Sequence, residues 1–73
     1  MSRIITKGVH PQTKEKVEIA FGYDVVPGFE PGYFFQAFKK NDPDETYVNE
    51  GFLKGISKQR LDELMMEWSV KLN

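Results

Sequence analysis

The chain has 73 residues, which is enough for one domain with a small core, and it contains no cysteine. Disulfides and cysteine-based zinc sites are therefore excluded, and a single histidine excludes a histidine cluster. The net charge of −1 argues against a general nucleic-acid binder, and the aromatic content of 14% argues against a disordered chain. We expect residues 1–73 to form one compact α+β domain that needs neither a metal nor a cofactor.

The opening segment MSRIITKGVHP lacks the apolar run and the small-residue cleavage site of a secretory signal. No window of the sequence approaches the roughly 18 apolar residues that a membrane-spanning helix needs. Together with the absence of cysteine, these features predict a soluble protein of the cytoplasm that makes no membrane contact.

Residues 3–23 have the pattern of a β-hairpin with a loop near residues 10–15. The first arm is rich in β-branched residues, and the second arm, VEIAFGYD, alternates apolar and polar residues. Pro11 favours a turn in the loop, and Lys14 is expected in a left-handed or bulged position. The side chains expected to face the core are Ile4 or Ile5 from the first arm and Val17, Ile19, Phe21 and Tyr23 from the second.

Two Pro-Gly pairs follow the hairpin, in the segments VPGF and EPGY. Each places proline and glycine at the two central positions of a type II turn. Two such turns in succession predict a stiff segment, because proline fixes its own backbone angle. A stiff loop binds without a large ordering cost, so this segment is either a plain connector or a preformed loop that presents Phe29.

The segment YFFQAFKK, residues 33–40, is predicted to be the third strand, with apolar groups on both of its faces. A single helix covers one face of a small sheet, so we expect one set of side chains in the core and the other partly exposed. The sequence does not decide which set is buried. The two alternating sets are Tyr33, Phe35 and Ala37, and Phe34, Gln36 and Phe38.

Residues 39–46, KKNDPDET, are expected to form a polar loop with a turn at its Asp-Pro-Asp sequence. The spacing of its acids resembles part of a calcium loop, but the remaining ligands and the glycine are missing, so no metal site is expected. Tyr47 and Val48 are predicted to start a short fourth strand. After a turn at residues 49–51, Phe52 and Leu53 are expected to pack under the helix.

The C-terminal helix has the clearest signals in the sequence. Ser57 is a favourable N-cap, and Ile56 and Leu61 are spaced as a hydrophobic staple. Trp68 is the expected anchor of the helix against the sheet, and Met66 falls outside the apolar stripe. The stripe consists of Leu61, Leu64, Met65, Trp68 and Leu72. The predicted fold is a three- to four-stranded antiparallel sheet with one C-terminal helix packed on one face.

Catalytic chemistry is poorly represented, and we expect no enzyme activity. His10 lies beside Pro11 in the first loop, where a turn role explains it, and there is no second histidine to build a triad. Asp62 and Glu63 are neighbours on the predicted helix, so their carboxylates do not face each other.

The surplus of aromatic residues favours a protein-binding module instead. Its size and composition suggest a small inhibitor or adaptor, of the phage or plasmid type, that occludes a site on a larger protein or nucleoprotein machine. Aromatic anchors carry much of the binding energy in such contacts, and acids can form a rim around them. The expected contact residues are the aromatics Phe29, Tyr33, Phe34 and Phe38 and the acids Glu30, Asp42, Asp44 and Glu45.

Two alternatives remain open on the sequence alone. An aromatic sheet face flanked by Lys39 and Lys40 has the character of a surface that stacks single-stranded nucleic acid. The same aromatics also suit a homodimer or larger homo-oligomer that buries its own surface.

Overall fold

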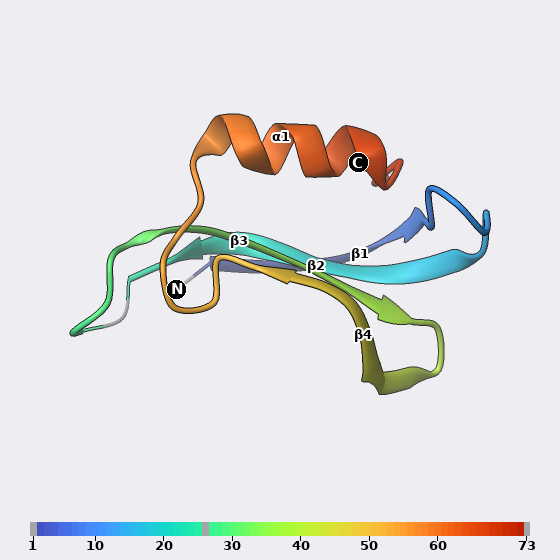
Figure 1. Cartoon of the computed structure of the whole chain (residues 1–73), viewed down its shortest axis with the longest axis horizontal. Coiled ribbons are helices and arrows are strands. Elements are labelled where there is room, and N and C mark those ends of the chain that lie inside the picture. The colour runs from blue at the N-terminus through green and yellow to red at the C-terminus, as the bar shows by residue number, and fades with distance from the viewer. Residues whose placement is uncertain (1, 26, 73) are drawn as a thin grey trace.

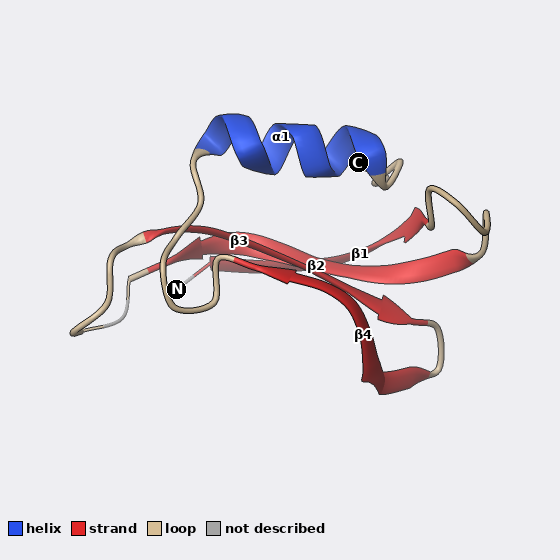
Figure 2. Ribbon diagram, in the orientation of Figure 1, coloured by secondary structure: helices blue, strands red, loops and turns tan. Residues whose placement is uncertain are grey.

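The computed structural model, which describes residues 2–25 and 27–72, consists of one antiparallel sheet and one helix, as predicted (Figures 1 and 2). The strands are β1 (Ser2–Val9), β2 (Lys16–Asp24), β3 (Gly32–Lys39) and β4 (Asp42–Glu50), and they lie in the order β1-β2-β3-β4. The helix α1 (Lys58–Glu67) covers one face of this sheet. We call the opposite face the open face.

The first hairpin confirms the prediction, with β1 and β2 paired from Ser2–Tyr23 to Val9–Lys16. Lys14 has φ 66°, the left-handed value expected for it. The third hairpin differs from the prediction, because β4 begins at Asp42 and extends through the segment expected to be a loop. The turn is reduced to Lys40 and Asn41, of which Asn41 has φ 66°. Two register shifts near Phe38 accommodate the polar first half of β4.

The double turn is half confirmed. Gly28 has φ 88°, as a type II turn requires at that position. Gly32 is instead the first residue of β3, so no second turn forms there. Val26, which opens the first predicted turn, lies outside the described residues.

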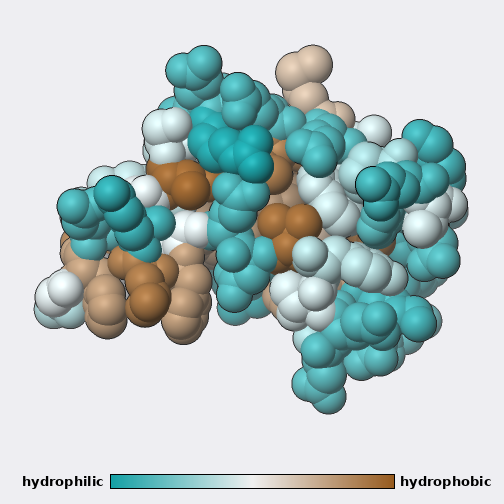
Figure 3. Space-filling view, in the orientation of Figure 1, coloured by the Kyte–Doolittle hydropathy of each residue, from teal (hydrophilic) through white to brown (hydrophobic). Residues whose placement is uncertain are grey.

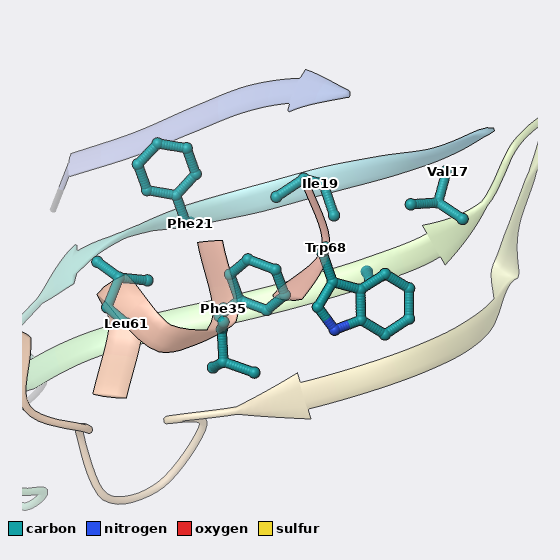
Figure 4. Packing of buried hydrophobic residues seen from close by; sticks show 8 residues of the cluster. Val17, Ile19, Phe21, Phe35, Leu61 and Trp68 are labelled. Carbon is teal, nitrogen blue, oxygen red and sulfur yellow. The ribbon is translucent and has the colours of Figure 1, made fainter. Parts of the chain in front are cut away.

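The core lies between α1 and the faces of β2 and β3 that point toward it (Figure 4). The set Tyr33, Phe35 and Ala37 faces the helix, because Phe35 pairs with Phe21 and Ala37 pairs with Ile19. Burial confirms most of the predicted core, and Met65 and Tyr33 pack partly buried at its margin. The buried cluster consists of Val17, Ile19, Phe21, Phe35, Ala37, Leu61, Leu64 and Trp68.

The prediction that Ile4 or Ile5 enters the core is wrong, because both side chains are exposed. β1 is an edge strand, whereas α1 packs over β3. Ile5 points to the open face, whereas Ile4 pairs with the core residue Phe21 and points to the helix-covered face. Ile4 is exposed nevertheless, because α1 makes its close contacts with β3 and none with β1 over the described residues. Tyr23, at the end of β2, is also exposed, and its ring contacts Tyr33 edge-on with centroids 5.1 Å apart.

The helix begins as the sequence predicts. The Ser57 side-chain oxygen accepts a hydrogen bond from the Arg60 backbone N–H at 3.2 Å. Trp68 follows the last helical turn and is buried, and Met66 is exposed on the outer surface. Leu72, predicted as the last residue of the stripe, lies beyond the helix and is exposed.

Candidate interaction surfaces

One end of the molecule is built by two connections that lie side by side, the β2–β3 loop and the segment between β4 and α1 (Figure 1). Tyr33 and Ile56 exchange backbone hydrogen bonds of 3.0 and 2.9 Å. Glu30 and Lys54 form an isolated bridge and an ion pair of 3.9 Å. These contacts tie the two segments together, so the side chains that they carry form one surface.

Glycine permits this approach of two backbones. A Cβ atom on Gly32 would lie 2.6 Å from the Cα atom of Gly55, which is closer than real Cβ contacts. Gly51 has φ 86°, and a Cβ there would lie 2.8 Å from the Cα atom of Phe34. Side chains at these positions would push the two connections apart.

Large apolar side chains gather on this end, and we call the group the apolar end. Its members are between 50% and 71% exposed. Figure 3 shows them as the brown and tan area at the left of the molecule, where the β2–β3 loop lies in Figure 1. Exposed apolar groups that cluster in this way are typical of interaction sites. The apolar end consists of Val25, Phe29, Phe52 and Leu53.

The apolar end continues onto the open face through a shallow pocket of ≈ 150 Å³. Phe52 lines the pocket, and Phe34 on β3, which is only 9% exposed, lies beside it. Arg3 and Asp24 contribute one charge of each sign to the same pocket. The pocket therefore combines an apolar wall with groups that can pair with either charge.

The structure brings together few of the contact residues predicted from the sequence. Phe29 and Glu30 lie at the apolar end, and Phe29 is exposed as expected. Phe34 is buried, so it is not an exposed anchor. Tyr33 lies on the helix-covered face and Phe38 on the open face, because residues five apart on a strand point in opposite directions.

The predicted acidic rim does not form. Asp42, Asp44 and Glu45 belong to the first half of β4, at the end of the sheet opposite the β2–β3 loop that carries Glu30 (Figure 1). Glu45 is paired with Lys39 at 3.7 Å instead.

Of the four side chains at the apolar end, only Phe29 was predicted as a contact residue from the sequence. Phe52 and Leu53 were expected under the helix, but they are 71% and 58% exposed. The prediction failed because α1 starts beyond a second pairing with β3 at Ile56, which leaves residues 51–55 outside the core. The glycines on both sides of this segment, Gly51 and Gly55, are the signal in the sequence that indicates a loop.

His10 stabilises the turn of the first hairpin loop, as predicted. Its Nδ1 atom accepts backbone hydrogen bonds from Gln12 at 3.1 Å and from Thr13 at 3.3 Å. Its ring centroid lies 5.0 Å from those of Tyr47 and Trp68. Within residues 2–25 and 27–72, no three His, Asp or Glu side chains are grouped closely enough to hold a metal ion.

Ion pairs fix the helix near its N-terminus. Arg60 donates to both carboxylate oxygens of Glu50, at 3.0 and 2.7 Å, and these hydrogen bonds raise the pKa of Arg60 above its usual range. Lys58 donates to Asp62 at 2.7 Å, and this hydrogen bond raises the pKa of Lys58. The first pair joins α1 to the end of β4, just before the Phe52–Leu53 segment.

No protein family, characterised protein or solved structure matches this chain. Over the described residues, no helix has the length and apolar character needed to cross a bilayer.

Proposed function

We propose that this chain is a non-catalytic protein-binding module and that it contacts its partner through the apolar end. The main support for this proposal is the exposure of Val25, Phe29, Phe52 and Leu53 on two neighbouring connections. The Glu30–Lys54 bridge joins the two connections, and Ile56 of the second is hydrogen-bonded to Tyr33 at the start of β3. Fully burying one side chain of this kind is worth about 1.5–3 kcal/mol. A partner that covers all four therefore has a substantial source of affinity.

The way the loops are joined supports a binding role. The Tyr33–Ile56 hydrogen bonds and the Gly32–Gly55 contact hold the β4–α1 connection against the start of β3, and the Glu30–Lys54 bridge joins it to the β2–β3 loop. A surface ordered in advance loses less conformational entropy on binding than a mobile one. Around it, Arg3, Asp24, Glu30 and Lys54 supply charges of both signs, which favour selection of a partner over general adhesion to charged surfaces.

A domain this small covers one site on a larger protein, so it acts either as an inhibitor that occludes the site or as an adaptor that marks it. The two roles differ in whether the partner's own activity falls on binding. Stacking of nucleic-acid bases on the sheet has less support, because Phe34 is buried and Tyr33 lies on the covered face. Of the four predicted aromatics, Phe38 alone combines partial exposure with a place on the open face.

The test is affinity capture from a lysate of the source cells, before and after nuclease treatment. We expect the wild-type chain to retain one dominant protein that survives nuclease, and the Phe29→Ser/Leu53→Ser variant to lose it. Met66→Ser is the matched control, because Met66 is 83% exposed but lies on the outer surface of α1. Equal recovery by the double variant would contradict the proposal.

Self-association is the closest rival and needs its own measurement. Light scattering over a concentration series separates the two, because a homodimer that buries the apolar end gains mass with no partner present. A dimer that dissociates in the Phe29→Ser/Leu53→Ser variant would replace the protein-partner proposal with a homo-oligomer.

A further inference from the structure

A second pocket, of ≈ 180 Å³, lies at the opposite end of the molecule, and four lysines line it. They come from four parts of the chain: Lys7 from β1, Lys16 from β2, Lys40 from the β3–β4 turn and Lys71 from the C-terminal segment. Ser69 completes the polar lining. We call this pocket the lysine pocket. Figure 3 shows mostly hydrophilic residues over this end of the molecule.

The C-terminal segment is held against the outer edge of β1 by backbone hydrogen bonds. The Val9 N–H donates to the Trp68 carbonyl oxygen at 2.7 Å, and the Lys71 N–H donates to the Lys7 carbonyl oxygen at 3.0 Å. The Thr6 hydroxyl donates to the Lys71 carbonyl oxygen at 2.9 Å. These bonds fix Lys7 and Lys71 next to each other although they are like charges.

The four lysines are also left without acidic partners in the described part of the chain. The ion pairs found there involve Lys39, Lys54, Lys58 and Arg60. None involves a lysine of the pocket, and Glu18, which lies opposite Lys7 in the sheet register, is not paired with it. The net charge of −1 therefore conceals a local concentration of positive charge.

The helix dipole explains part of this lysine cluster, because the C-terminal end of α1 carries a partial negative charge that a lysine can stabilise. The last turn of α1 carries no basic residue, so Lys71 can serve there. Lys16 and Lys40 belong to other elements of the sheet and have no such role. Gathering four cations at one pocket raises their mutual repulsion, and a bound anion relieves it.

We infer that the lysine pocket binds a phosphate group. Lysines act as point charges that converge on compact, multiply charged anions, whereas a single carboxylate offers one charge for four cations. The Ser69 hydroxyl can donate to a phosphate oxygen. The phosphate comes from a free polyphosphate or from the phosphodiester backbone of a nucleic acid, and these two sources share the chemistry that the pocket recognises.

The test is a two-dimensional NMR titration at constant ionic strength, with pyrophosphate in one series and single-stranded oligothymidylate in the other. Sodium chloride is exchanged to keep the ionic strength fixed. We expect saturable shifts of the Gly8, Ser69 and Lys71 amides, and none at Phe29 or Lys54. Saturation with pyrophosphate alone identifies a free polyphosphate. Saturation with oligothymidylate, displaced by pyrophosphate, identifies the backbone. The absence of saturable shifts in both series overturns the inference.

The binding site can also be located with a variant, independently of the NMR chemical-shift changes. The Lys7→Gln/Lys40→Gln variant removes two charge contacts and should weaken binding by about tenfold, which corresponds to ~1.4 kcal/mol. The hydrogen bond to Lys7 uses its backbone carbonyl, so the variant retains it. Lys58→Gln removes the same kind of charge at the far end of α1 and should leave the affinity unchanged. Equal weakening by Lys58→Gln would show that only net charge matters, and would overturn the inference.

Discussion

The two ends of this molecule are built by the same means but carry opposite chemistry. At each end, an irregular segment is hydrogen-bonded to a strand: Ile56 to Tyr33 at the apolar end, and Lys71 to Lys7 at the lysine pocket. One end then exposes large apolar side chains, and the other exposes four lysines that form no ion pair within the described residues. A domain with an ordinary core and a net charge near zero can therefore carry two different kinds of surface at opposite ends of one sheet.

The ends also differ in how their contacts respond to salt. Burial of apolar surface is insensitive to moderate salt, whereas attraction to exposed lysines is screened over a Debye length of roughly 8 Å at physiological ionic strength. Ionic strength is therefore a simple way to distinguish a ligand of one end from a ligand of the other.

We expect the largest effect from Trp68→Ala, because unfolding of the domain would remove the apolar end and the lysine pocket together. Trp68 is buried against the sheet, and its carbonyl oxygen holds β1. We expect a loss of about 3–5 kcal/mol in the free energy of unfolding, enough to unfold a domain of this size. Chemical denaturation measures this, and an unchanged midpoint would contradict the core assignment.

Two further variants control that experiment. Trp68→Phe should cost less, because the Trp68 Nε1 atom has no hydrogen-bond partner among the described residues, so no bond is lost with the indole. Met66→Ala should change stability by less than about 0.5 kcal/mol, because its side chain is exposed.

Gly32→Ala should affect the apolar end and spare the lysine pocket. The added Cβ meets the backbone of Gly55, which cannot rotate away as a side chain does. We expect a cost of about 1–3 kcal/mol and faster hydrogen exchange at the Tyr33 and Ile56 amides. Gly28→Asn is the control, since no atom lies within 4 Å of a Cβ there and asparagine tolerates a positive φ. Equal exchange rates in the two variants would show that the glycine contact does not hold the loops.

A smaller effect is expected in the pH dependence of stability, which should distinguish the Lys58–Asp62 pair from the Arg60–Glu50 pair at the start of α1. The pKa of Lys58 is raised by its hydrogen bond to Asp62, so the stabilisation is complete below the ordinary lysine pKa of 10.5 and is lost as pH rises through the raised value. The Arg60–Glu50 pair persists over the same range, because the pKa of Arg60 is raised further still. The part of the alkaline loss of stability that comes from Lys58 should therefore be absent in Asp62→Asn and remain in Glu50→Gln. The reverse pattern would contradict this assignment.

The smallest expected effect is a gain of stability at the lysine pocket. Lys7→Gln removes one of four clustered like charges and should stabilise the fold by a few tenths of a kcal/mol in dilute buffer. The gain should vanish in about 1 M salt, where the Debye length is ~3 Å. Thermal unfolding at both salt concentrations measures it, and a gain that persists at high salt would indicate a packing effect instead of repulsion.

The fold was largely accessible from the sequence, because its signals are local. Alternation from Val17 to Phe21 identified β2 and its buried face, and Ser57 with the stripe through Trp68 identified the helix and its start. The surfaces were not accessible in the same way. Phe52 reads as core because it is large and apolar, and its exposure follows from the place where α1 begins.

Local sequence was enough to predict β1, β2, β3, α1, the first hairpin and most of the core, since hydrophobic periodicity and capping act within a few residues, but it placed the start of β4 too late. Tertiary structure alone decided that Phe34 is buried, that Glu30 and Asp42 lie at opposite ends, and that four lysines distant in sequence share one pocket. The reason is that the exposure and grouping of surface side chains depend on which residues lie beside them in space. Which neighbours a side chain has depends on strand order, register and the path of the connections, and none of these is set by local sequence alone.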